Sequence, residues 1–112
     1  TFRDPDTFAQ VGKPFVYGAT GPNAFDAPGL VLFSYRKIGV NVPRSARAQC
    51  TQIGREIQSD ELRKGDLICY NNGSHVALYY DEGWMVDARD AEHGVVYEGV
   101  IGANAKFRTF RP

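Results

Sequence analysis

Hydrophobic and polar positions follow two different periods along the 112-residue chain. In the first half, small and apolar side chains recur at the spacing of one helix face and predict a helix over residues 26–38, at Ala27, Leu30, Val31, Ser34 and Ile38. From Asp66 onward the period changes to two, with short apolar runs separated by Asn/Gly and Glu/Gly turns. Because helices come first and a strand meander follows, the pattern predicts an α+β domain.

The other expected elements are shorter. A short helix is expected to start at Asp4-Pro5 and to run through Gln10. Another is expected over residues 44–52, and a single helical turn over residues 59–62. An antiparallel sheet of about five strands is predicted from the alternating runs at 67–70, 76–80, 84–88, 95–97 and 106–110.

The start of the 26–38 helix has the local chemistry of a reactive site. Asp26 is a good N-cap, and Pro28 fits the first turn because the missing proline N–H is not needed there. Residue 27 therefore stands at the positive end of a buried helix, directly after a Gly/Pro/Asn-rich loop. A helix N-terminus lowers the pKa of a thiol and favours a nucleophilic thiolate. Here the residue is Ala27.

The second candidate feature is a hairpin. If Tyr80 pairs with Trp84 across the turn, Ala77 lies opposite Asp87, and His75 becomes a diagonal neighbour of Asp87 on the same face. A histidine with a carboxylate behind it can activate a nucleophile, because the carboxylate fixes the tautomer and stabilises the imidazolium. A hydrogen-bonded histidine near a strand end, without a catalytic role, is the alternative.

Composition narrows the class of protein. The length fits one domain, residues 1–112, and 43% hydrophobic residues describe an ordinary globular protein. Lys+Arg and Asp+Glu both number 13, which argues against a nucleic-acid partner. No run is long enough for a membrane span, and no signal peptide is present. Since the chain begins at a threonine, we expect a fragment of a longer secreted protein.

Neither the cysteines nor the acidic residues suggest a metal or cofactor. We expect Cys50 and Cys69 to be two buried free thiols, with a disulfide as the alternative, because their spacing shows no disulfide framework. Asp87, Asp90 and His93 are spaced like metal ligands only if that segment is helical, which its strand pattern contradicts. We therefore expect no metal site and no cofactor.

Several motifs, taken in order, resemble the NlpC/P60 family of cell-wall cysteine peptidases, whose pattern runs G-x-P-(Y/F)-x-(Y/W)-G-G, then F-D-C-S-G-L, L-P-R-(S/T), L-x-x-G-D-L and (S/G)-H-V-(G/A)-I-Y. The matching positions cover nearly the whole chain: Gly12, Pro14, Phe15, Tyr17, Gly18, Phe25-Asp26, Gly29-Leu30, Val42-Pro43-Arg44-Ser45 with Gln49, Leu62 to Leu67, and Ser74 to Tyr79. Two positions depart: Ala27 stands where the family has its cysteine, and Pro28 where it usually has serine.

The resemblance implies a papain-like fold, with His75 as general base and Asp87 in the position of its third, polar member. The family's chemistry is hydrolysis of the γ-D-glutamyl–diaminopimelate (or Lys) bond of peptidoglycan. Because the methyl group of Ala27 cannot attack a carbonyl, and Pro28 removes a backbone N–H near a prospective oxyanion hole, we expect no meaningful turnover.

The cleft is still expected to bind stem peptides. The resemblance places Tyr17 and Asp26 near the free amine or scissile bond of the peptide, and Ser74 beside the base. Arg44 is placed to meet a substrate carboxylate, and Trp84 at the hairpin is a candidate sugar or peptide platform. The alternatives are that Asp26 only caps the helix, that Arg44 is a solvated surface residue and that Trp84 belongs to the core.

The sequence therefore favours a monomeric NlpC/P60-like domain, secreted to the bacterial cell wall or surface, that engages peptidoglycan stem peptides without cleaving them. A natural pseudoenzyme and a deliberately inactivated endopeptidase both fit Ala27. A protein-interaction module on the same scaffold is the alternative from another functional class.

Overall fold

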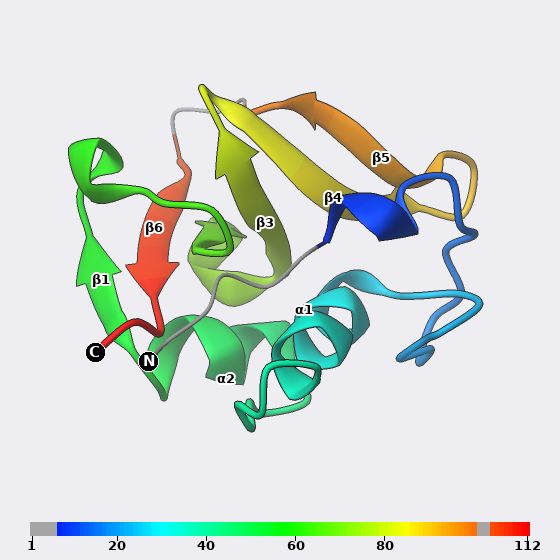
Figure 1. Cartoon of the computed structure of the whole chain (residues 1–112), viewed down its shortest axis with the longest axis horizontal. Coiled ribbons are helices and arrows are strands. Elements are labelled where there is room, and N and C mark those ends of the chain that lie inside the picture. Colours follow the sequence, from blue (N-terminus) through cyan, green and yellow to red (C-terminus); the bar gives the residue numbers. More distant parts are fainter. Residues whose placement is uncertain (1–6, 101–103) are drawn as a thin grey trace.

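The computed structural model describes residues 7–100 and 104–112, and it places the two α-helices on one side of a single sheet (Figure 1). The helices are η1 (Phe8–Gln10), α1 (Ala27–Arg36), α2 (Ala46–Thr51), η2 (Ser59–Glu61) and η3 (Asn71–Gly73). The strands are β1 (Arg55–Ile57), β2 (Leu67–Tyr70), β3 (His75–Asp81), β4 (Trp84–Asp90), β5 (Gly94–Gly99) and β6 (Lys106–Thr109). The helix start expected at Asp4-Pro5 lies outside the described residues.

The sheet confirms the expected α+β class. Its strands are antiparallel in the order β1-β6-β2-β3-β4-β5, six among the described residues rather than about five. The additional strand, β1, has the sequence Arg-Glu-Ile, two polar residues and one buried isoleucine. It pairs along β6 at the edge of the sheet, so its strand character comes from the partner rather than from its own pattern.

Helix α1 begins and packs as its sequence predicts. The Asp26 side chain accepts a hydrogen bond from the Gly29 N–H and caps the first turn, while Pro28 occupies that turn. The buried face includes Leu30 and Val31 and packs against β3 and β4. This packing holds the first residue of the helix, Ala27, in the same buried cluster as Val76 near the start of β3.

Apolar side chains fill both faces of the sheet. The larger cluster lies between the sheet and α1 and includes Phe25, Leu30, Val31, Leu78 and Val86. A smaller cluster on alternate strand positions of the sheet is formed by Ile68, Ala77 and Met85. Alternation along β3 and β4 therefore places His75 and Asp87 on the same face as the smaller cluster.

The hairpin register at the turn differs from the predicted one. Trp84 pairs with Asp81 rather than with Tyr80, and a β-bulge between Tyr79 and Asp81 absorbs the extra residue. Beyond the bulge, Leu78 lies opposite Val86, which is the register that the sequence predicts for this part of the hairpin. The bulge explains why the local prediction at the turn is wrong while the face assignment of His75 and Asp87 holds.

The expectation of two free thiols is wrong. Cys50 on α2 and Cys69 on β2 form a disulfide, with Cα atoms 6.1 Å apart. Their separation of 19 residues along the chain gave no indication of this contact, because it depends on how α2 folds back over β2. The bond ties one helix of the helical layer directly to the sheet.

Candidate active site

A cleft of about 680 Å³ opens where the start of α1, the start of α2 and the segment leading into β3 meet. Six of the residues that the sequence indicates lie along its wall: Tyr17, Asp26, Ala27, Arg44, Ser74 and His75. These positions are far apart in the chain, and the fold brings them together. Tyr17 is 85% exposed and stands at the surface of the cleft.

Behind the cleft, His75 contacts Asp87. The imidazole Nε2 lies 2.6 Å from the Asp87 Oδ1, and Asp87 is only 4% exposed. When Nε2 carries the proton for this contact, Nδ1 is left as an acceptor, the form a general base requires. Burial lowers the pKa of His75, but the hydrogen bond and charge of Asp87, with the charge of Glu98, outweigh it and raise that pKa above 6.5.

Asp26 has three partners. Its Oδ1 accepts from the Gly29 N–H at 2.7 Å, and its Oδ2 accepts from the Gly18 N–H at 2.9 Å and from the Arg44 Nη2 at 2.8 Å. Asp26 as a whole is 6% exposed, so these contacts satisfy a buried charge. The predicted helix cap is confirmed, and the same group also anchors Arg44 at the mouth of the cleft.

Ala27 is the first residue of α1 and is 6% exposed, so only a small part of its methyl group is accessible from the cleft. The wall beside it is held by the buried Gln49, whose Nε2 donates to the Pro28 carbonyl at 3.0 Å and to the Pro43 carbonyl at 2.8 Å. This side chain joins the start of α1 to the segment that carries Arg44. Sequence reasoning noted Gln49 only as part of a motif and did not assign this role.

Trp84 is not brought to the cleft. It lies at the turn end of β4, three residues from Asp87, and stacks on Tyr97 with ring centroids 5.1 Å apart. The exposed fraction of Trp84 is 43%, so the ring belongs to a partly open aromatic cluster away from Ala27 and His75. Trp84 therefore does not line the cleft, and its role as a sugar or peptide platform at the hairpin stays a prediction.

Glu98 was missed by sequence reasoning. It lies with Asp87 and His75 around a smaller pocket of about 280 Å³, and the Arg89 Nη1 is 3.5 Å from its Oε1. Desolvation, followed by a hydrogen bond and charge repulsion from Asp87, raises the pKa of Glu98. The pairing of β5 with β4 creates this contact, and only the register of both strands could have revealed it.

The metal pattern suggested by spacing does not assemble. The Nδ1 of His93 lies 2.7 Å from the Asp90 Oδ1, whereas Asp87 faces His75. Within residues 7–100 and 104–112, no three His, Cys, Asp or Glu side chains are grouped to hold a metal ion. The described helices are also too short or too polar to cross a membrane.

Comparison with known proteins gives one consistent family. The NlpC/P60 family model matches residues 12–111. The chain is 35% identical over 94 residues to a probable endopeptidase of Corynebacterium glutamicum, covering 79% of this chain and 44% of that protein. It is also 35% identical over 97 residues to the peptidoglycan endopeptidase RipA of Mycobacterium tuberculosis, covering 73% of this chain and 20% of RipA. The chain thus spans less than half the length of these curated relatives.

Solved structures share the fold. The peptidoglycan hydrolase RipB of Mycobacterium tuberculosis superposes with a TM-score of 0.81 at 28% identity, over 93% of this chain and 60% of that chain. Structures have also been solved for RipA variants mutated at a cysteine, at a histidine and at a glutamate. The cysteine variant superposes with a TM-score of 0.81 at 31% identity, over 91% of this chain and 57% of that chain. Together with the family match over nearly all of its length, this likeness shows that the chain belongs to the NlpC/P60 family.

Proposed function

We propose that this domain binds peptidoglycan stem peptides in the cleft and does not cleave them. The observation that carries the proposal is Ala27, an inert methyl group, at the helix N-terminus in a cleft that it shares with His75. The relatives named as endopeptidases and peptidoglycan hydrolases supply the substrate class. Tyr17, Arg44 and Ser74 line the same cleft and would hold the peptide.

Two observations support the proposal that Ala27 occupies the nucleophile position of the family. The N-terminus of α1 carries partial positive charge, which would stabilise a thiolate there. In the RipA structures, the mutated histidine and glutamate are twelve residues apart, the same separation as between His75 and Asp87. Along the RipA sequence, the mutated cysteine precedes that histidine by a number of residues that equals the Ala27–His75 separation to within one residue.

His75 and Asp87 remain as a general base and its carboxylate partner, with no nucleophile for them to activate. His75 and Asp87 could polarise a water, but loss of the nucleophile from such a unit leaves only weak residual acceleration. Pro28 adds to the loss, because its nitrogen has no hydrogen to offer an oxyanion near the start of α1. The inferred parent reaction is hydrolysis of the γ-D-glutamyl–diaminopimelate (or Lys) bond.

The disulfide and the relatives support a location outside the cell. Disulfides such as Cys50–Cys69 persist in oxidising compartments and are rare in the cytosol. One of the curated relatives is named a peptidoglycan endopeptidase, and peptidoglycan is a component of the bacterial cell wall. We infer a secreted or surface-exposed domain at a bacterial cell wall.

The test is a cleavage assay with purified stem peptides. We expect no turnover by the unmodified chain and measurable cleavage by the Ala27→Cys variant, because a thiolate there would have His75 as its base. The matched control is Ala27→Cys combined with His75→Ala, which keeps the thiol and removes the base. Turnover by the unmodified chain would overturn the proposal of a silent domain.

Binding is measured separately from cleavage. We expect stem peptides to shift the amide NMR signals of Gly18, Ala27 and Ser74 in the unmodified chain, since all three line the cleft. Absence of any shift, with the protein folded, would contradict peptide binding and would favour a protein-interaction module.

A further inference from the structure

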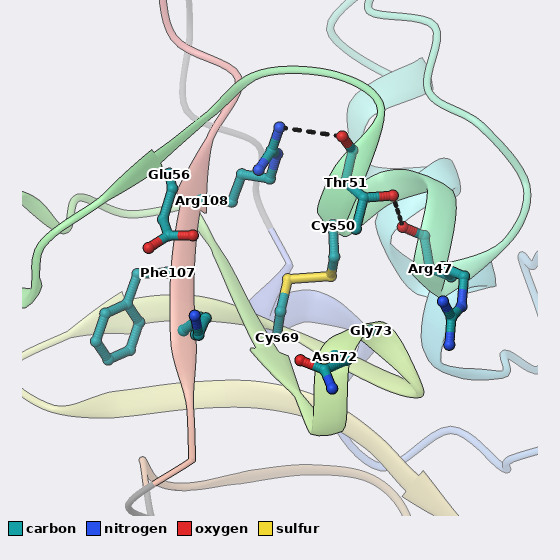
Figure 2. Close-up of a pocket in the computed structure, with 10 residues that line it drawn as sticks. Arg47, Cys50, Thr51, Glu56, Cys69, Asn72, Gly73, Phe107 and Arg108 are labelled. Carbon is teal, nitrogen blue, oxygen red and sulfur yellow. Dashed lines mark hydrogen bonds between the residues drawn. A yellow bond between two sulfur atoms is a disulfide. The ribbon is translucent and has the colours of Figure 1, made fainter.

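We propose that a second pocket, adjoining the cleft, binds an oxyanion: the carboxylate or phosphate group of a ligand. This cationic pocket has a volume of about 390 Å³ and is lined by Arg47 of α2, Lys106 and Arg108 of β6, and Glu56 of β1, with the Cys50–Cys69 disulfide in its wall (Figure 2). A volume of this size lies at the lower end of the range for small-molecule sites. The inference goes beyond stem-peptide binding and does not depend on it.

Charge is the first reason. Three cationic side chains and one carboxylate line the cationic pocket, although the chain as a whole has a formal net charge of zero. Within the described residues, the side chains of Arg47 and Lys106 make no ion pair with a carboxylate. Because both side chains are also exposed, they are available to an anion from solvent.

Arg108 is a cation held in place at the wall of the pocket. Glu56 lies opposite it in the β1–β6 register, but among the described residues no carboxylate comes within ion-pair distance of its guanidinium. Its Nε donates to the Ile53 carbonyl at 2.5 Å and its Nη2 to the Gly54 carbonyl at 3.2 Å. These neutral acceptors fix the position of the guanidinium but do not cancel its charge. The result is a held positive group at the wall of the pocket, and a fixed group binds a ligand at less entropic cost than a free surface arginine.

The walls of the pocket are also fixed. The disulfide links α2 to β2, and Figure 2 shows it between the Arg47 side and the Arg108 side of the pocket. A Cβ atom on Gly73 would lie 2.9 Å from the Arg47 Cα, so η3 packs directly against the helix that carries Arg47. The cations therefore come from two elements, α2 and β6, whose separation the disulfide and the Gly73 contact constrain.

The cationic pocket is continuous with the cleft, because Arg47 and Gly73 line both. A ligand seated in the cleft could extend an acidic group past Gly73 toward Lys106. A small oxyanion could equally enter the cationic pocket alone. This second case allows the pocket to be tested without any ligand in the cleft.

The test is an amide NMR titration of the whole chain at constant ionic strength, with inorganic phosphate in one series and glutarate in another. We expect saturable shifts of the Thr51 and Asn72 signals, which line this pocket and not the cleft, in at least one series. Saturation by phosphate alone would assign a phosphate ligand, and saturation by glutarate alone would assign a carboxylate ligand. Saturation by both would support a general oxyanion site.

Paired variants decide whether the named cations are responsible. Arg47→Gln with Lys106→Gln should weaken the apparent affinity roughly tenfold, since two charge-assisted contacts are lost. Arg36→Gln with Lys37→Gln removes the same two charges from exposed positions on the far end of α1 and should leave the affinity unchanged. Non-saturating shifts in both series, or equal loss in both pairs, would overturn the proposal. Binding in the cleft is read separately from the Gly18 and Ala27 signals, because these two residues line the cleft and not the cationic pocket.

Discussion

At the scale of single residues, the protonation of His75 is controlled by the carboxylate behind it. We predict that NMR titration of the unmodified chain will give His75 a pKa above 6.5, because the contact with Asp87 outweighs burial. In Asp87→Asn, burial remains while the negative charge is lost, so the pKa should fall below that of the unmodified chain. A His93→Gln variant assigns the two histidine signals. An unchanged pKa in Asp87→Asn would contradict this account.

The same shift predicts the sign of a stability change with pH. Since the folded-state pKa is raised above the unfolded value, protonated His75 stabilises the fold fully below about pH 6.5, and this contribution is lost as pH rises through the folded pKa. The difference in free energy of unfolding between the unmodified chain and His75→Gln should therefore shrink over that range in urea titrations.

Residue contacts could be predicted from the sequence only where the chain between them is short and regular. The closeness of His75 and Asp87 follows from a hairpin of known length, and the structure places them 2.6 Å apart. Cys50 and Cys69 are joined by the docking of α2 on β2, and Glu98 approaches Asp87 through a third strand. Neither contact leaves a periodic trace in the sequence.

At the scale of elements, Gly29 sets how closely the loop before α1 can approach the helix. A Cβ atom at this position would lie 2.0 Å from the Ala19 carbonyl oxygen and 2.6 Å from the Asp26 Oδ1. Glycine to alanine inside a helix ordinarily stabilises by about 1 kcal/mol. Here we predict the opposite sign, a loss of about 2 kcal/mol or more in the free energy of unfolding, because backbone atoms would have to move.

Urea unfolding of Gly29→Ala measures this loss, with Gly99→Ala as the control. The backbone of Gly99 is suitable for alanine, and the nearest atom to its added Cβ is the Gly83 carbonyl oxygen at 3.9 Å. A Gly29→Ala protein as stable as the control would mean that the loop yields without cost.

Helix α1 was predictable because its cap, its first-turn proline and its apolar face all agree. Strand β1 was not, since a three-residue Arg-Glu-Ile segment has no period of its own and becomes a strand only against β6. The bulge near Tyr79 was hidden for a similar reason, because it reflects how the turn closes rather than which residues are apolar.

At the scale of the whole molecule, the order of strands departs from a simple meander. Strand β6 inserts between β1 and β2, so the end of the chain pairs with two strands that precede it by about forty residues or more (Figure 1). Sequence patterns give strand positions but not this order, because pairing between distant segments is set by packing. The LxxGD motif contributes to this closure, through Asp66.

Asp66 joins the start of β2 to the C-terminal segment. The carboxylate is 1% exposed and accepts from the Thr109 Oγ1 at 2.7 Å, the Arg111 Nη2 at 2.6 Å and the Arg63 N–H at 2.9 Å. Removing one partner of a buried ion pair leaves the other charge, here that of Arg111, without its counterion. Asp66→Ala should therefore lower the free energy of unfolding by about 3–5 kcal/mol. Asp60→Ala, at an exposed position in η2, should change it by less than about 0.5 kcal/mol. Urea unfolding compares the two variants, and Asp66→Asn separates the role of charge from that of hydrogen bonding. Equal stability of the two alanine variants would mean that β6 and the C-terminal segment are held by β-pairing alone.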